Sequence, residues 1–560
     1  MLDRTLRSLS SRIDPAGWFA AGASVAKNAA RNPVGVAAAT GKLAASLAQV
    51  PADVARVAIG ADTTAPAPDD PRFRDHAWQD NPAYFAILRW YLCTRSYVDS
   101  LVDAGTDDPT TAAKARQLTN LLLDMAAPSN NPFTNPTVAT RAIATGGKSL
   151  ARGAAYLLED IVERGGRPKR IDDTAFTVGK NMAITPGEVV YRNDLIELIQ
   201  YAPQTEQVHA VPLLACPPWI NKFYIMDIGP GRSFVEWAVR QGRTVFLISY
   251  RNPDASMSGI GFDNYLVDGV SAAMDVVEDI TGAPTVDLVG LCLGGAMASI
   301  AAGYLATVGD SRMGTLTLAN TLLDYSNPGE LGLMTDPETL AKVDLLMQRT
   351  GCLDGKNMSR TFDLLRANDL IFRYWVSRWM LGEEPQAFDL LAWNEDSTRM
   401  PASMHSTYLH TLYGENQLVQ GTFTIAGQRI SLSKVTGDVY LVGAQDDHIV
   451  PWTSSFAGAA LFGGDVRFVL SNGGHIAGIV NPPGKKSWIE VCGAPENHTA
   501  LTSSATPEVW RASAERRAVS WWEDWAVWAN KRAGELQAPP PMGSKTYPTL
   551  GSAPGTYVFG

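Results

Sequence analysis

Apolar positions change their spacing near residue 186, and this change divides the chain into two regions. Before it, apolar residues recur every three or four positions, as in "YFAILRWYLCTRSYVDSLVDAG", a period typical of amphipathic helices. After it, short β-branched runs alternate with helical stretches. We therefore predict a mainly helical N-terminal domain over residues 1–185 and an α/β domain over residues 186–560.

Six runs in the second region have the length and composition of buried strands. They are "VPLLACPPW", "TVFLISY", "TVDLVG", "GTLTLAN", "DVYLVGA" and "VRFVLSN". Loop or helix-like sequence follows each of the first four, which indicates a mostly parallel sheet. Residues 322–435 are rich in Trp, Phe, Leu and Met and lack this repeat, so we expect them to form a cap inserted into the α/β domain.

Three further segments have recognisable patterns. Residues 18–58 are rich in Ala and Val and predict a weakly amphipathic helix broken near Pro33; it packs on the body of the protein or seeks a hydrophobic surface. Residues 61–73 are a turn-rich linker. Near the C-terminus, Trp521, Trp525 and Trp528 lie at i, i+4 and i+7, which predicts a helix attached to the core by an aromatic stripe.

Composition excludes several classes of protein. The 560 residues carry a net charge of -10, which argues against electrostatic binding of nucleic acid. We find no apolar run of transmembrane length, no signal peptide in "MLDRTLRSLSSRIDPAGWFAAGAS" and no metal-binding motif. The scattered, odd-numbered cysteines fit a reducing cytoplasm better than a disulfide framework; they are Cys93, Cys216, Cys292, Cys352 and Cys492.

The stretch "VDLVGLCLGGAMAS" has the pattern of a nucleophile elbow with cysteine in place of serine. In such an elbow a strand turns sharply into a helix, and small residues two positions either side of the nucleophile allow the turn. The helix N-terminus favours a thiolate at Cys292, and the N–H of Leu293 would face a developing oxyanion. A buried structural cysteine at a tight turn is the alternative.

The order of residues downstream favours catalysis. In the α/β-hydrolase fold the nucleophile is followed by an acid and then by a histidine, both after strands. "YLVGAQDDHIVPW" supplies Asp446 and Asp447 after one predicted strand, and "FVLSNGGHIAG" supplies His475 after the next. We predict His475 as general base and Asp447, rather than Asp446, as its partner. His448 is either a supporting residue of the site or purely structural.

A cysteine nucleophile favours acyl transfer over simple hydrolysis. A thioester substrate exchanges onto a thiol with little change in free energy, and the acyl-cysteine stays activated for transfer to an alcohol. An apolar cap would keep water away. These features predict an acyltransferase that is loaded from an acyl-CoA and forms an ester.

The chain resembles the polyhydroxyalkanoate (PHA) synthases over roughly residues 70–560. The blocks that carry the resemblance include "TNPTVATRAIATGGKSLARG", "VGKNMAITPGEVVYRNDLIELIQYAP", "PPWINKFYIMDIGP", "FDLLAWNEDSTRMP", "DDHIVPW", "SNGGHIAGIVNPPG" and "APGTYVFG". The N-terminal blocks look most like the medium-chain-length branch of the single-subunit enzymes. The resemblance implies an α/β-hydrolase fold with a cap, behind a mainly helical N-terminal domain.

The resemblance also implies the roles of individual residues. Cys292, Asp447 and His475 fall on the family's catalytic residues, and Trp393 matches a tryptophan at its dimer interface. The alternative for Trp393 is an ordinary tryptophan in the core of the cap. The implied reaction polymerises (R)-3-hydroxyacyl-CoA, with no cofactor. We place the second oxyanion donor at Ile220, in the loop Trp219–Asn221. Arg251 could meet CoA phosphates, but a loop-anchoring role is the simpler interpretation.

The implied partners are a nascent polyester chain at a granule surface in the cytoplasm and a second copy of the chain in a homodimer. Two other functions are compatible with parts of the sequence. A cysteine-nucleophile esterase or thioesterase would share the elbow but leave the cap and the N-terminal domain unexplained. A non-catalytic granule protein would need no triad.

Overall fold

The fold is given by a computed structural model that describes residues 16–63, 68–172, 174–495 and 506–560. Its backbone separates into two units. The helical unit consists of Met1–Asp172 with Asn357–Phe388, and the α/β unit consists of Asp173–Lys356 with Asp389–Gly560. Residues 1–15 lie outside the described ranges, and they include most of the N-terminal segment in which we expect no signal peptide. Residues 64–67 of the expected linker also lie outside them.

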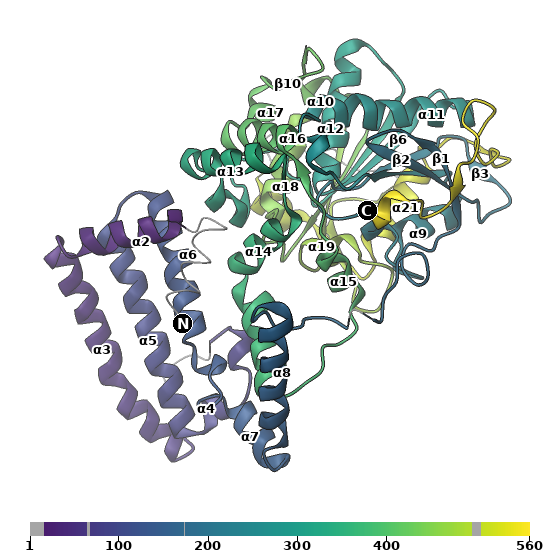
Figure 1. The fold of residues 1–560 in the computed structure, drawn as a ribbon. Coiled ribbons are helices and arrows are strands. Elements are labelled where there is room, and N and C mark those ends of the chain that lie inside the picture. The colour runs from purple at the N-terminus through teal and green to yellow at the C-terminus, as the bar shows by residue number, and fades with distance from the viewer. Residues whose placement is uncertain (1–15, 64–67, 173, 496–505) are drawn as a thin grey trace. The chain divides into compact units, whose positions relative to one another are not determined.

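The helical unit is built from α-helices of very different lengths (Figure 1). Its helices from the N-terminal part of the chain are α2 (Ala16–Ala29), α3 (Pro33–Ala58), α4 (Ala77–Asp80), α5 (Pro82–Gly105), α6 (Pro109–Met125), α7 (Pro136–Ala144) and α8 (Lys148–Arg164). The four that begin with proline share one start signal, an Asn or Asp side chain that accepts a hydrogen bond from the first turn. The predicted break near Pro33 is confirmed, because α2 ends and α3 begins around it.

The first helices pack on their neighbours within this unit. Ala21 and Val25 of α2 form a buried cluster with Val102 of α5 and with Ala112 and Ala115 of α6. Burial of these small side chains lets the helices approach closely. Of the two alternatives for residues 18–58, packing on the body of the protein is the one that these contacts support.

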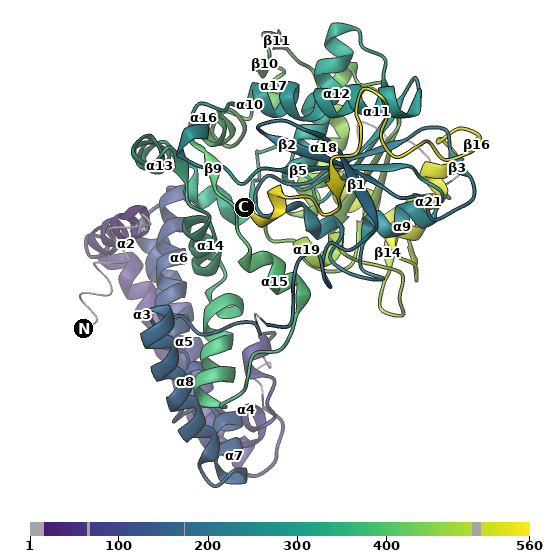
Figure 2. The ribbon, with the colours of Figure 1, turned by 45° about the vertical axis from the view of Figure 1, so that its right-hand side comes forward.

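The segment Asn357–Phe388 belongs to the helical unit, although its sequence position falls inside the predicted cap (Figure 2). Its π-helical turn η8 (Trp375–Met380) lies against α8. The wholly buried Asp160 carboxylate accepts hydrogen bonds from Arg378 Nε at 2.8 Å and Trp379 Nε1 at 2.7 Å. A buried carboxylate is costly unless it is paired, so these bonds hold the segment to α8.

The α/β unit contains an 11-stranded sheet among its described residues. From edge to edge the strands are β15 (Glu515–Arg517), β14 (Ile489–Val491), β13 (Val466–Ser471), β12 (Val439–Ala444), β7 (Met313–Ala319), β6 (Val286–Leu291), β4 (Leu213–Cys216), β5 (Val245–Tyr250), β2 (Ile196–Tyr201), β1 (Gly187–Arg192) and β17 (Gly551–Ser552). All six predicted strands are present, and they pair in parallel. The α/β fold class is thereby confirmed.

Antiparallel strands extend both edges of this parallel core and were not predicted. On one side β2 pairs with β5 and β1 pairs with β2, and on the other β14 pairs with β13. The central strands are buried on both faces, which explains their continuous apolar runs. Because parallel strands all end at one edge of the sheet, the loops that follow β4, β6, β7, β12 and β13 meet there.

Helices cover both faces of the sheet (Figure 1). The helix α12 (Leu293–Val308) packs on β6 and β7, and α21 (Trp521–Asn530) packs beside α9 (Phe234–Arg240). The predicted aromatic stripe is confirmed, because Trp521, Trp525 and Trp528 of α21 are fully buried. Trp525 Nε1 donates to Thr317 Oγ1 at 2.9 Å, which satisfies one indole N–H inside the core.

The rest of the predicted cap stays with the α/β unit. Its elements there include η6 (Gly329–Met334), α13 (Pro337–Thr350), α15 (Asp389–Glu395), α16 (Ala402–Thr407), η9 (Tyr408–Gly414) and α17 (Gln417–Gln420). The turn η9 connects α16 and α17, and both α16 and η9 contact α13. Over the described ranges, none of the helices has both the length and the apolar character that a membrane span requires.

Candidate active site

The turn between β6 and α12 has the geometry of a nucleophile elbow. Cys292 has φ 52° and ψ −118°, a conformation that non-glycine residues rarely adopt and that stores strain. Its backbone N–H donates to Ala319 O at 2.9 Å, which ties the elbow to the end of β7. The thiol is half-buried at the carboxyl end of β6.

Three glycines make this turn possible. A Cβ on Gly290 would collide with the backbone of Gly295, and one on Gly294 would collide with the carbonyl of Cys216. A Cβ on Gly295 would collide with the side chain of Thr321. Close packing of strand, helix and neighbouring loop therefore requires glycine at all three positions, which is the physical basis of the sequence pattern.

Substitution of Gly295 by alanine is expected to destabilise the α/β unit. Its Cβ must displace the buried Thr321 side chain, and overpacking of this kind lowers the free energy of unfolding by about 1–3 kcal/mol. Gly259→Ala is the matched control, because a Cβ there meets no atom within 4 Å. Denaturant unfolding of both variants tests this, and equal stabilities would contradict it.

His475 and Asp447 complete a chain of hydrogen bonds to the thiol. His475 Nε2 lies 3.1 Å from Cys292 Sγ, and His475 Nδ1 lies 2.6 Å from Asp447 Oδ2. Both the imidazole and the carboxylate are buried. Asp446 is exposed, so the structure places Asp447 rather than its neighbour against the histidine.

Strand ends position these two residues. Asp447 follows β12, and its Oδ1 accepts the N–H groups of Ile449 and Val450 at 2.9 and 2.8 Å. His475 is the first residue of α19 (His475–Ile479), directly after the loop that leaves β13. Both oxygens of Asp447 are thus occupied, one by the backbone and one by the imidazole, so the carboxylate is fixed in orientation.

The electrostatics of the site favour a charged imidazole. Burial works against the charge of His475, but the Asp447 carboxylate and the Cys292 thiolate, with their hydrogen bonds, outweigh it. The pKa of His475 is therefore raised well above its ordinary value. A histidine with these neighbours can accept the thiol proton and keep it while the thiolate reacts.

Sequence analysis missed Asn320, which holds the backbone of the histidine. The residue has φ 48°, is fully buried, and its Nδ2 donates to His475 O at 2.6 Å. Asn tolerates the left-handed conformation better than most residues. The available signal was the asparagine that ends the run "GTLTLAN", at the carboxyl end of the strand beside the elbow.

The two backbone groups predicted as oxyanion donors lie in ordered segments. The N–H of Leu293 belongs to the first turn of α12, where N–H groups have no intrahelical acceptor. Ile220 lies between Trp219 and Asn221, and Thr398 holds both neighbours. Its Oγ1 donates to Trp219 O at 3.1 Å and accepts from Asn221 N at 2.9 Å.

The other residues singled out by sequence, Trp393, Arg251 and His448, make hydrogen bonds or ion pairs within the α/β unit. Trp393 is buried, and its Nε1 donates to Lys222 O at 2.7 Å. Arg251 forms an ion pair with Asp254 at 3.1 Å. The backbone carbonyl of His448 accepts a hydrogen bond from the N–H of Glu330 in η6.

Tyrosines of the cap and of the loop after β7 pack against one another. Tyr325 and Tyr408 are buried, and their rings contact Tyr413 at centroid distances of 4.8 and 5.4 Å. Tyr408 also meets Trp219 edge-on at 5.4 Å. The Cys292 thiolate is close enough to contribute to the raised pKa of both Tyr325 and Tyr408, after the larger effect of burial.

His405 of α16 makes the cap sensitive to acid. Burial lowers the pKa of its imidazole to about 4, against the opposing effect of Asp344, so the residue stays neutral in the folded protein. The unfolded chain binds a proton below about pH 6.5, so the stability contributed by neutral His405 is lost as pH falls from about 6.5 towards 4.

His405→Gln should therefore reduce the acid sensitivity of folding. We expect the wild type to lose about 2 kcal/mol more of its unfolding free energy between pH 7 and pH 5 than the variant does. His410→Gln is the control, because its imidazole is half-exposed. Denaturant unfolding at the two pH values measures the difference; parallel pH profiles for wild type and His405→Gln would refute it.

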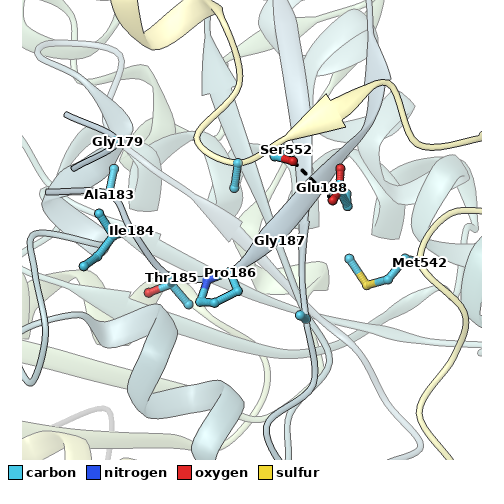
Figure 3. Close-up of a pocket in the computed structure, with 11 residues that line it drawn as sticks. Gly179, Ala183, Ile184, Thr185, Pro186, Gly187, Glu188, Met542 and Ser552 are labelled. Carbon is cyan, nitrogen blue, oxygen red and sulfur yellow. Dashed lines mark hydrogen bonds between the residues drawn. The ribbon is translucent and has the colours of Figure 1, made fainter. Parts of the chain in front are cut away.

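A separate cavity of about 360 Å³ lies at the edge of the sheet beside β1 (Figure 3). Residues 183–188 line it together with Met542. Cys292, Asp447 and His475 do not line this cavity, and we assign the cavity no part in the chemistry. Within the described ranges, no group of three or more His, Cys, Asp or Glu side chains is arranged to hold a metal ion.

Comparisons with known proteins show the family to which the chain belongs. A family model described as "Poly-beta-hydroxybutyrate polymerase (PhaC) N-terminus" matches residues 69–238, and one described as "alpha/beta hydrolase fold" matches residues 223–482. The chain is 38% identical over 508 residues to "Poly(3-hydroxyalkanoate) polymerase 1" of Ectopseudomonas oleovorans, covering 90% of this chain and 89% of that protein.

Two further relatives have similar identities. "Poly(3-hydroxyalkanoate) polymerase" of Methylorubrum extorquens is 40% identical over 496 residues, which cover 88% of this chain and 81% of the relative. "Poly(3-hydroxyalkanoate) polymerase subunit PhaC" of Cupriavidus necator is 38% identical over 511 residues, which cover 89% of this chain and 84% of that relative.

Proposed function

The chain belongs to the family of poly(3-hydroxyalkanoate) polymerases, and from this premise we propose that it joins (R)-3-hydroxyacyl groups from coenzyme A thioesters into a polyester. It is an acyl-transferring enzyme on an α/β-hydrolase fold. The observation that carries the mechanism is the continuous hydrogen-bonded path from Asp447 through His475 to Cys292 at the elbow.

In the first half-reaction, His475 accepts the thiol proton of Cys292 through Nε2. The thiolate attacks the thioester carbonyl, and a C–S bond forms as the carbonyl oxygen becomes an oxyanion. That intermediate then expels the CoA thiolate, which takes the proton from His475. The product is an acyl-Cys292 thioester, close in free energy to the thioester that was consumed.

The backbone N–H groups of Leu293 and Ile220 are proposed to stabilise the oxyanion. The Leu293 N–H has no acceptor within the helix, because it lies in the first turn of α12. The loop around Ile220 is held by Thr398, so it needs no rearrangement when charge develops on the oxyanion. Preorganised donors of this kind contribute more than donors that must first turn away from water.

In the second half-reaction, a 3-hydroxyl of another monomer or of the growing chain attacks the acyl-cysteine. His475 accepts the hydroxyl proton, the new ester forms, and the thiolate leaves and regains a proton. Asp447 is proposed to orient and stabilise the imidazolium, since both of its oxygens are already engaged. The acyl-CoA is a substrate, and the proposed reaction uses no cofactor.

The alternative, a thioesterase, differs only in the acceptor of the acyl group. Purified protein is given (R)-3-hydroxyacyl-CoAs of several chain lengths, and both free thiol and insoluble polymer are quantified. Thiol release with polymer supports the synthase. Thiol release with free hydroxy acid alone would show a thioesterase instead of a synthase. If the protein releases no thiol and forms no polymer, a non-catalytic granule protein remains as the alternative.

Two assembly properties belong to the same proposal. We propose that the enzyme acts at the surface of the insoluble polymer granule in the cytoplasm, and as a homodimer. Trp393 is buried in the α/β core, where its indole N–H is already satisfied, which argues for a supporting rather than a direct part in a dimer contact. Light scattering during chromatography, before and after acylation, measures the oligomeric state.

A further inference from the structure

One buried polar group in the loop after β7 has no role in the reaction described so far. The hydroxyl of Tyr325 is fully enclosed, and among the described residues it has no hydrogen-bond partner. A buried hydroxyl without a partner is unfavourable, and such groups are rare in folded proteins. Its two aromatic neighbours differ in this respect, because the hydroxyls of Tyr408 and Tyr413 are hydrogen-bonded to one another.

The backbone around Tyr325 is held on both sides. Its N–H donates to Asn416 Oδ1 at 3.0 Å, and Asn416 Nδ2 donates to Asp324 Oδ1 at 2.9 Å. This links the loop after β7 to the cap between η9 and α17. Because the backbone is anchored and the ring packs on Tyr413, the hydroxyl stays where it is instead of turning to a protein acceptor.

The same loop wraps the elbow. Ala319 accepts the Cys292 N–H, Asn320 holds the carbonyl of His475, and Thr321 packs on Gly295. Tyr325 continues this segment and lies close enough to Cys292 for the thiolate to help raise the phenol pKa, after the larger effect of burial. The loop that contacts Cys292, His475 and Gly295 therefore also carries the unpaired hydroxyl.

We propose that Tyr325 is a specificity-determining residue whose hydroxyl donates a hydrogen bond to the 3-oxygen of the acyl group on Cys292. This inference rests on the proposed function. The C1 carbonyl of the acyl group lies with the oxyanion donors, and the 3-oxygen lies two carbons further along the chain. A site built to hydrogen-bond a substrate hydroxyl rejects the analogue that lacks it, since its own buried donor is then left unpaired.

The test measures the first half-reaction with two substrates of equal chain length. With enzyme in excess, thiol release is followed from (R)-3-hydroxyoctanoyl-CoA and from octanoyl-CoA. The wild type should prefer the hydroxylated substrate. Relative to the wild type, Tyr325→Phe should have a kcat/KM for (R)-3-hydroxyoctanoyl-CoA that is lower by about 10- to 100-fold. Its kcat/KM for octanoyl-CoA should differ from the wild-type value by less than about threefold.

Tyr201→Phe is the matched control. Its hydroxyl is also buried and unpartnered among the described residues, but the neighbouring charge is Asp227 rather than Cys292. It should keep the wild-type preference. A thermal unfolding midpoint for each variant separates loss of selectivity from loss of folding.

The outcomes distinguish the two proposals. Absence of thiol release by the wild type would remove the proposed function itself. Release with no preference for the 3-hydroxyl would overturn the assignment of Tyr325. An equal loss on both substrates in Tyr325→Phe would also overturn it, because the hydroxyl would then serve the thiolate and not the 3-oxygen. Loss confined to the hydroxylated substrate supports it.

Discussion

Cys292→Ala is expected to abolish both thiol release and polymer formation. The alanine methyl group cannot form a thioester, so the path through an acyl-enzyme is closed. Removal of a nucleophile from a hydrogen-bonded triad lowers kcat by roughly 10⁵-fold or more, which here means loss to the detection limit. The measurement is free thiol and insoluble polymer from a (R)-3-hydroxyacyl-CoA, with both products assayed in the same sample.

Another half-buried thiol provides the control for this variant. Cys352 in β8 (Cys352–Leu353) pairs with β9 (Met400–Pro401), and its sulfur lies 4.0 Å from Thr350 O rather than beside an imidazole. Cys352→Ala should retain activity within about twofold. Polymer formation by Cys292→Ala would exclude the covalent mechanism, and loss of activity in Cys352→Ala would show that thiol removal acts nonspecifically.

Cys292→Ser should separate acylation from transfer. Serine would accept the acyl group as an oxoester, and its hydroxyl is far less acidic than a thiol. Transfer from an oxoester to another alcohol is no longer favoured by the higher energy of a thioester. We expect slow thiol release with little polymer.

Asp447→Asn is expected to reduce kcat by roughly 10²–10⁴-fold while the fold is retained. The asparagine amide would present an N–H to Nδ1 of His475, and the ring would respond by carrying its proton on Nε2. A protonated Nε2 faces Cys292 as a donor and cannot accept the thiol proton. The carboxylate charge that raises the pKa of His475 is also lost.

Asp446→Asn is the neighbouring control and should keep activity within about threefold. Its side chain is exposed, while Asp447 is buried against the imidazole. Steady-state thiol release by the two variants decides between the adjacent carboxylates. The reverse result, a large loss in Asp446→Asn with an active Asp447→Asn, would require a different arrangement of the site from the one described.

Much of the site could be predicted because its signals are local. The glycines of "GLCLGG" are required by close contacts within a few residues of the turn or with the adjacent strands. The acid and the histidine follow strands that can be recognised from composition alone, and parallel strands bring their ends together. Helix starts were equally local, as the break at Pro33 illustrates.

Contacts between distant segments were not predictable in this way. Residues 357–388 read as part of a cap, yet Asp160 and Arg378, 218 positions apart, join them to the N-terminal helices. Asn320 reaches His475 across 155 positions. Apolar periodicity reports which face of an element is buried, and does not report which other element buries it.

The sequence by itself determined the α/β-hydrolase fold, the elbow at Cys292 and the order of nucleophile, acid and histidine. Only the tertiary structure decided that Asn320 holds the backbone of His475, that Trp393 is buried in the core, and that the buried Tyr325 hydroxyl has no partner among the described residues. The reason is physical. Backbone conformation and strand burial follow from neighbouring residues, whereas burial and hydrogen bonding of a single side chain depend on elements that fold onto it from far along the chain.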